Sequence, residues 1–93
     1  MSDLLGRIPA RSQRVQWREF GSEAILLDPS TGEFAQINEI GAAIWRFIDG
    51  KRTVGDIADA LLDEFDALPA DVARDVQAFI TELSATSLLS LAS

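Results

Sequence analysis

The side chains that carry most nucleophilic and acid–base catalysis are missing from this 93-residue sequence, which contains no His and no Cys. Their absence excludes disulfide frameworks, zinc sites with the usual ligands, thiol catalysis and every triad that needs an imidazole base. Carboxylates remain, and Asp56, Asp59, Asp63 and Glu64 lie close together in the chain. They lack the ligand order of a calcium loop, so we interpret them as a solvated helix face. The sequence therefore predicts no enzyme: no catalytic residues, no metal site and no cofactor.

The balance of charge restricts the partners that the chain can bind. Eight Lys+Arg against 15 Asp+Glu give a formal net charge of −7, and an acidic surface repels the phosphates of nucleic acids. The one adjacent basic pair, Lys51 and Arg52, is expected in a solvated turn. No apolar run approaches the roughly 20 residues that span a bilayer, and the first residues lack the apolar core of a signal peptide. We therefore expect a cytoplasmic protein with neither a membrane nor a nucleic acid as partner.

The length and the 47% content of hydrophobic residues favour one compact domain near the lower size limit for an independent core. Residues 1–14 mix Arg, Gly, Pro and Ser without a helical or alternating apolar period. We predict a flexible N-terminal arm over residues 1–14 and the folded domain over residues 15–93.

Three strands are predicted at the start of that domain. Apolar residues alternate with polar ones from Val15, Gly21 and Ser22 form a tight turn, and residues 24–27 are a short apolar run. The sequence Asp-Pro-Ser-Thr-Gly at 28–32 supplies the residue types of a second turn. A hairpin into a third strand over residues 33–37 is the expected continuation.

Three helices follow, because the apolar period changes from two to about 3.6 after Ile37. Asn38 is a good N-cap for the first helix, and Thr53 with Asp56 resembles a capping box for the second. Pro69 suits the first turn of the third helix, which fades near residues 86–87 and is followed by a leucine-rich tail that packs on the core. The chain is thus expected to be α+β: a three-stranded antiparallel sheet followed by three helices on one face.

The third strand is an edge with little protection against pairing, since residues 33–37 include neither Lys nor Pro. If Ala35 and Ile37 face the helices, Phe34 and Gln36 face outward. An aromatic ring on the open face of an edge strand invites a partner, although a single exposed ring is also ordinary surface. The same edge can pair with a second copy, which would give a homodimer by edge-strand pairing or swapping.

Two segments of the chain resemble a known family. The sequence INEIGAAIW at 37–45, followed by DGKRTVGDI at 49–57, is similar to the pattern of the PqqD-like family, also called RiPP recognition elements (RREs). The resemblance covers roughly residues 15–89. It implies a winged helix-turn-helix-like fold without catalysis, in which the leader of a ribosomally synthesised precursor peptide adds as a strand to the third strand. Such a protein is a stand-alone peptide chaperone.

The resemblance also implies a binding site and an enzyme partner. Carried onto this sequence, the peptide-binding residues are Glu33, Phe34, Ala35, Gln36 and Ile37 on the strand, and Val72, Asp75, Val76, Phe79 and Ile80 on the third helix. Family members deliver the peptide to a modifying enzyme, either a radical SAM protein in PQQ biosynthesis or a leader peptidase and cyclase in lasso-peptide synthesis. Trp45 and the turn at 28–32 are more similar to the broad stand-alone members, so both pathways stay open.

Other interpretations of the same residues compete with this one. A stripe such as Val76, Phe79 and Ile80 is usually plain core, and we expect at least one of the three to be shared between core and groove. Trp17 and Trp45 are expected as core fillers. The alternative function is a winged-helix DNA-binding regulator, although the third helix, which would enter the major groove, is acidic.

Overall fold

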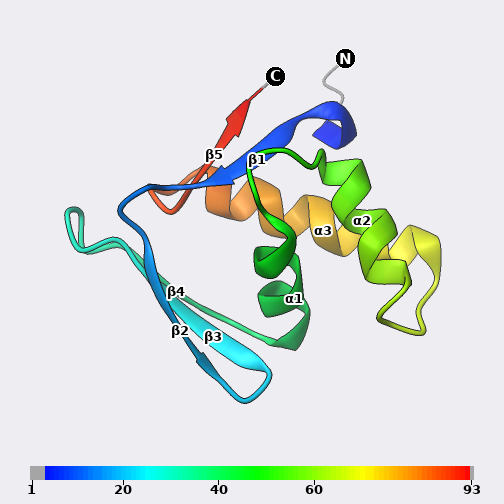
Figure 1. Cartoon of the computed structure of the whole chain (residues 1–93), viewed down its shortest axis with the longest axis horizontal. Coiled ribbons are helices and arrows are strands. Elements are labelled where there is room, and N and C mark those ends of the chain that lie inside the picture. The colour runs from blue at the N-terminus through cyan, green and yellow to red at the C-terminus, as the bar shows by residue number, and fades with distance from the viewer. Residues whose placement is uncertain (1–3, 93) are drawn as a thin grey trace.

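Two antiparallel sheets and three helices make up the part of the chain that the computed structural model describes, residues 4–92. Figure 1 shows helix α1 standing between the three-stranded sheet and the α2–α3 pair. The elements are η1 (Leu4–Gly6), β1 (Ile8–Arg11), β2 (Gln16–Phe20), β3 (Glu23–Leu27), β4 (Phe34–Ile37), α1 (Glu39–Phe47), α2 (Val54–Leu62), α3 (Pro69–Ser84) and β5 (Leu89–Ala92).

The predicted three-stranded sheet is confirmed, with the order β2-β3-β4 and antiparallel pairing throughout. A two-residue turn joins β2 to β3, and its first residue, Gly21, has φ of 60°, a conformation that glycine adopts without strain. Along β3, Ala24 and Leu26 face the core while Ile25 and Leu27 face outward. The alternation places one face of the sheet against α1 and leaves the other exposed.

The predicted helices begin at the expected caps. The side chain of Asn38 accepts a hydrogen bond from the Gly41 N–H at 2.9 Å at the start of α1. Thr53 and Asp56 form a complete capping box at the start of α2, even though the third position holds Asp rather than the usual Glu or Gln. No helix within residues 4–92 is both long and apolar enough to cross a membrane.

The core lies where α1 meets the sheet on one side and α2 and α3 on the other. Its largest fully buried side chain is that of Trp45, and the helices supply most of the remaining volume. Each layer of the fold contributes fully buried side chains, which are those of Leu26, Ile44, Ile48, Val54, Ile57, Leu61, Val76, Ile80 and Leu88. One continuous core over all three helices and the sheet explains why so short a chain forms a single unit.

The N-terminal segment differs from the flexible arm predicted for residues 1–14. Over its described part, β1 pairs with β5 at the opposite end of the chain, in the register Ile8↔Ala92 to Arg11↔Leu89. Pro9 is buried in this second sheet. Residues 8–11 therefore belong to the packed unit and not to a flexible arm; residues 1–3 and residue 93 of the predicted arm and domain lie outside the described residues.

Arg11 holds this segment onto the helices. Its Nη2 donates to the carbonyl oxygen of Trp45 at 2.7 Å, and its guanidinium lies 4.6 Å from the ring centroid of Trp17 and 5.2 Å from that of Trp45. The two rings meet edge to face at 5.7 Å. The prediction that both tryptophans fill the core is right for Trp45, which is 1% exposed, and wrong for Trp17, which is 42% exposed on the outer strand β2.

Candidate functional site

Strand β4 is an edge of the three-stranded sheet, and the alternation of its hydrogen bonds to β3 shows which of its backbone groups are free. The Asp28 N–H donates to the Glu33 carbonyl at 2.8 Å, so Asp28 and Glu33 form a hydrogen-bonded pair. Such pairs alternate along an antiparallel ladder, so β3 uses the backbone groups of Ala35 and Ile37. The N–H and C=O groups of Phe34 and Gln36 consequently point away from the sheet.

The C-terminal half of α3 and the residues that follow it are held near the two ends of β4. At the start of β4, the Glu33 carboxylate accepts a hydrogen bond from the Ser87 N–H at 2.8 Å, and the hydroxyls of Thr31 and Ser87 are 2.9 Å apart. At the other end, Gly41 lets Phe79 approach α1: a Cβ at Gly41 would lie 2.9 Å from Cε1 of Phe79 and 3.0 Å from Cβ of Ile37. The chain after α3 and the end of α3 thus run antiparallel to β4.

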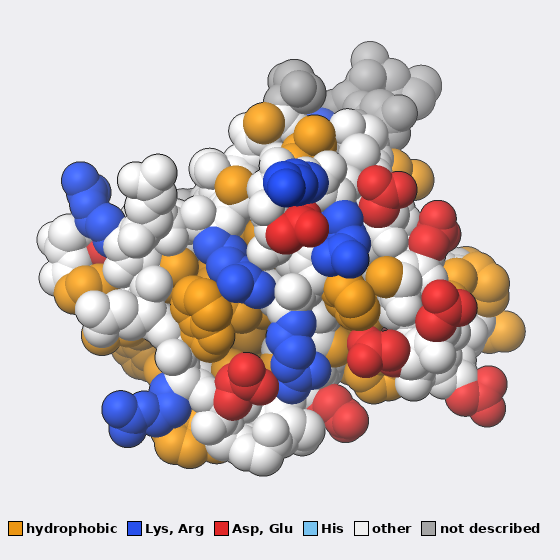
Figure 2. Space-filling view, viewed as in Figure 1, with side chains coloured by type: hydrophobic (Ala, Val, Ile, Leu, Met, Phe, Trp, Pro, Cys, Tyr) orange, Lys and Arg blue, Asp and Glu red, His pale blue; other side chains and the backbone are white. Residues whose placement is uncertain are grey.

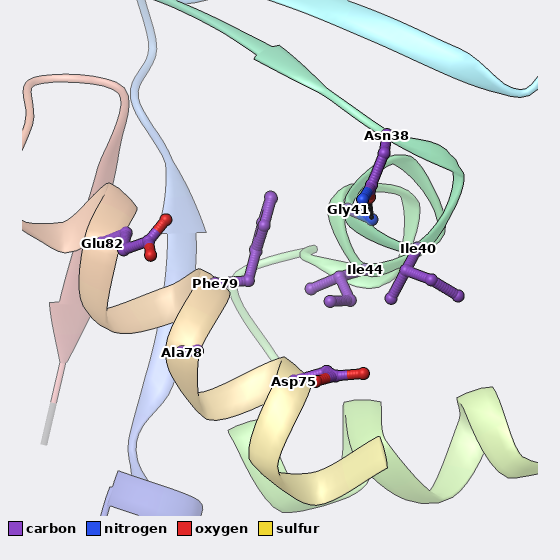
Figure 3. A pocket seen from close by; sticks show the side chains of 8 residues that line it. All are labelled: Asn38, Ile40, Gly41, Ile44, Asp75, Ala78, Phe79 and Glu82. Carbon is purple, nitrogen blue, oxygen red and sulfur yellow. Dashed lines mark hydrogen bonds between the residues drawn. The ribbon is translucent and has the colours of Figure 1, made fainter. Parts of the chain in front are cut away.

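A groove of about 280 Å³ opens between α1 and α3 where β4 ends. Figure 3 shows the side chains of Asp75, Phe79 and Glu82 projecting from α3 into the space that faces α1. Apolar surface from α1 forms the opposite wall, and Asn38 lies at the strand end. The complete lining is Asn38, Ile40, Gly41, Ile44, Asp75, Ala78, Phe79 and Glu82.

The strand residues predicted for the site alternate between exposed and buried side chains, as expected along a β-strand. Phe34 is 70% exposed and Gln36 is exposed, whereas Ala35 is half-buried and Ile37 is buried against the helices. Glu33 precedes β4, and its carboxylate is engaged by the Ser87 N–H. The edge therefore presents two outward side chains together with its free backbone groups.

The helix residues predicted for the site separate into three positions. Asp75 and Phe79 line the groove. Val72 lies in a neighbouring hollow of about 50 Å³ between α1 and the α2–α3 turn, which also contacts Ile40 and Asp75. Val76 and Ile80 are 0% exposed and belong to the core, because they lie on the face of α3 that packs against α1 and α2. These two support the groove wall from behind and do not line it.

Several groove residues were absent from the sequence prediction. Gly41 and Glu82 are the informative ones. Glu82 follows Phe79 by three residues and Asp75 by seven, a spacing that places all three on one helical face and could have been recognised in the sequence. Gly41 gave no such signal, since only the packing of α1 on α3 shows why a side chain does not fit there.

Few basic side chains lie close to the acidic side chains of the groove. Arg74 forms ion pairs with Asp71 at 3.1 Å and, more distantly, with Asp75 at 3.9 Å, and its side chain is 72% exposed. Glu82 has no ion pair with any residue in 4–92. The groove thus offers an apolar surface and two carboxylates next to a free strand edge.

Comparison with known proteins assigns this arrangement to a family. The family described as "Coenzyme PQQ synthesis protein D (PqqD)" matches residues 23–89, which include β3, β4 and the three helices. The chain belongs to the PqqD family. A protein of Rhizobium meliloti (strain 1021), named "PqqA binding protein", is 30% identical over 82 residues, which is 88% of this chain and 82% of that protein.

Solved structures share the fold. The structure titled "TbiB1 in Complex with the TbiA(beta) Leader Peptide" matches with a TM-score of 0.76 and 26% identity, and the match covers 86% of this chain and 93% of that one. The solution structure of the PqqD part of Methylobacterium extorquens PqqCD, described as a stand-alone RiPP recognition element, matches with a TM-score of 0.72 and 25% identity over 89% and 88% of the two chains. The expected α+β fold and the family resemblance are both confirmed.

Proposed function

We propose that this PqqD-family chain is a non-catalytic adaptor that binds the leader of a ribosomally synthesised precursor peptide. The peptide adds as a strand to β4 and lies beside α3. The observation that carries the proposal is the free edge of β4, where the backbone groups of Phe34 and Gln36 point away from the sheet next to the groove. Main-chain hydrogen bonds along such an edge give affinity, and neighbouring pockets give specificity.

The relatives support a peptide as the ligand. The Rhizobium protein is named for binding PqqA, and the TbiB1 structure contains a leader peptide. A DNA-binding role has no comparable support in these relatives, and α3 has a single basic residue, Arg74, where a recognition helix needs several for phosphate contacts.

The adaptor would act by presenting the bound peptide to a modifying enzyme. Tethering one part of the peptide raises the effective concentration of the rest at the enzyme's active site, so a domain without catalytic groups accelerates the chemistry of its partner. The partner would be a radical SAM protein of the PQQ type or a peptidase and cyclase of the lasso type, acting in the cytoplasm. A second copy of the chain pairing on β4 would compete with the peptide for the same edge.

A pair of substitutions at Gln36 tests the strand-addition step. Gln36→Pro removes an outward N–H, whereas Gln36→Ala changes the side chain and keeps that donor. The probe is a labelled synthetic leader from the short open reading frame nearest to the gene, and fluorescence anisotropy gives its Kd. We expect Gln36→Pro to raise the Kd by about fivefold or more relative to Gln36→Ala, since a main-chain hydrogen bond contributes about 1 kcal/mol.

A thermal melt of both variants separates lost binding from lost folding. Phe34→Pro, at the second outward position, gives an independent reading if Gln36→Pro unfolds the chain. Equal affinities for Gln36→Pro, Phe34→Pro and Gln36→Ala would contradict strand addition at β4.

A further inference from the structure

The excess negative charge of the chain comes from its second half. Residues 1–52 contain seven basic and seven acidic residues, whereas residues 53–93 contain one basic and eight acidic residues. Figure 2 shows many of the acidic side chains on the side where α2 lies, whereas acidic and basic side chains are mixed over the centre. The net charge of −7 is thus the charge of the segment that provides one wall of the groove.

Within the groove, one face of α3 presents an acidic, an aromatic and a second acidic side chain in succession. Asp75, Phe79 and Glu82 lie four and three residues apart, so they occupy the same helical face, and Figure 3 shows them together on the groove side. The seven residue steps from Asp75 to Glu82 rise about 10 Å along the helix axis, with the ring of Phe79 between the two carboxylates.

None of the eight residues that line the groove is basic. Asp75 has only the distant Arg74 guanidinium, at 3.9 Å, and Glu82 has no ion pair among residues 4–92. Two carboxylates beside a partly buried aromatic ring match the chemistry of a long basic side chain, whose methylene stem packs on the ring while its charged end reaches an acid.

We propose that the bound peptide carries a Lys or Arg that enters this groove, so that Asp75, Phe79 and Glu82 select for a basic residue. The inference rests on the proposed peptide-binding function and specifies its ligand. Because Phe79 packs against Gly41 just beyond the end of β4, the basic residue lies within a few positions of the segment that pairs with Phe34 and Gln36. The remaining acidic residues of 53–93 add long-range attraction toward such a peptide.

A phage-displayed library of random peptides tests the preference, because it does not depend on the sequence of the natural leader. The purified full chain is compared with the double variant Asp75→Asn/Glu82→Gln, and the matched control is Asp59→Asn/Glu64→Gln, which removes the same two charges from exposed positions outside the groove. We expect the wild type and the control to enrich Lys or Arg at one position of the selected peptides, and the groove variant to lose that enrichment.

One selected peptide is then synthesised with its basic residue and with Gln in that place. For the wild-type chain we expect the Gln peptide to have a Kd about three- to tenfold higher, and for the groove variant we expect the two peptides to bind equally. Peptides that bind the β4 edge without enrichment of basic residues, or with the same enrichment in the groove variant, would overturn the inference alone. Failure to recover any peptide whose binding is lost in Gln36→Pro would overturn the proposed function, and the inference with it.

Discussion

Asp28 is the buried carboxylate that closes the turn before β4. Its Oδ1 accepts hydrogen bonds from the Ser30 hydroxyl at 2.7 Å and from the Ser30 N–H at 2.9 Å, while its own N–H starts the ladder between β3 and β4. Hydrogen bonds to the ionised form, that from the Ser30 hydroxyl first, hold the pKa of Asp28 below its ordinary value of 3.8. The turn that determines which backbone groups of β4 point away from the sheet therefore depends on a charged carboxylate.

The lowered pKa of Asp28 predicts a pH dependence of stability. Because the folded chain binds this proton less tightly than the unfolded chain, the stabilisation is complete above about pH 4 and is lost as the pH falls through the lower, folded-state pKa. We expect Asp28→Asn, which keeps an acceptor oxygen but does not titrate, to lose less stability between about pH 5 and about pH 2 than the wild type. Urea unfolding followed by tryptophan fluorescence measures the difference. Asp59→Asn is the control, and a wild-type pH profile in Asp28→Asn would contradict the assignment.

At this scale the sequence predicted the residues whose role is local. Asn38, Thr53 and Asp56 cap helices through residues three positions away, so their types and spacing suffice. Phe79 was implied as a site residue by the family resemblance. The reason for Gly41 could not be predicted, because its close approach joins residues 38 positions apart in the chain.

Among the elements, α1, α3 and β4 meet at Gly41. A Cβ there would crowd the Phe79 ring of α3 at 2.9 Å and Ile37 of β4 at 3.0 Å. Gly in a helix interior is less favourable than Ala by up to about 1 kcal/mol, and the penalty is smaller in the first turn, where Gly41 lies.

Gly41→Ala should therefore destabilise the chain despite the better helix propensity of Ala. Overpacking costs about 1–3 kcal/mol, which exceeds the propensity gain, and we expect a net loss of about 1 kcal/mol in the free energy of unfolding. The displaced ring would also narrow the groove and weaken peptide binding. Urea unfolding and peptide anisotropy measure the two effects.

Two further variants separate crowding from other causes. Gly55→Ala in α2 adds the same methyl group outside the groove, with its nearest neighbour at 3.3 Å. Adding Phe79→Leu to Gly41→Ala should recover part of the lost stability, since the smaller side chain makes room. A more stable Gly41→Ala with unchanged binding would show that the close approach has no cost.

The elements themselves were largely predictable, with one exception. Apolar alternation and helical stripes gave the three-stranded sheet and all three helices to within a few residues at their ends. The pair β1–β5 was missed because each strand has only four residues, β1 contains Pro9, and the partners lie at opposite ends of the sequence. Pairing at that separation depends on the tertiary fold, which first brings the two segments together.

Over the whole molecule, one side is closed by strand pairing and the other side leaves a strand edge unpaired. The β1–β5 sheet and Arg11 join the N-terminal segment to the helices, and the three-stranded sheet leaves β4 as an edge beside α3. The net charge follows from the composition. Its concentration in residues 53–93 becomes relevant to ligand binding only because the structure places α3 next to that edge. A free edge with a groove beside it supplies the parts that strand addition by a peptide needs.

Amide hydrogen exchange by NMR, with and without the synthetic leader peptide, tests strand addition at β4 most directly. The Ala35 and Ile37 N–H groups already pair with β3, so their protection should change little when the peptide binds. We predict that the Phe34 and Gln36 N–H groups, exposed in the free chain, become protected together, with shifts extending to Phe79 and Glu82. Peptide binding that leaves the Phe34 and Gln36 amides exchanging as in the free chain would contradict the account.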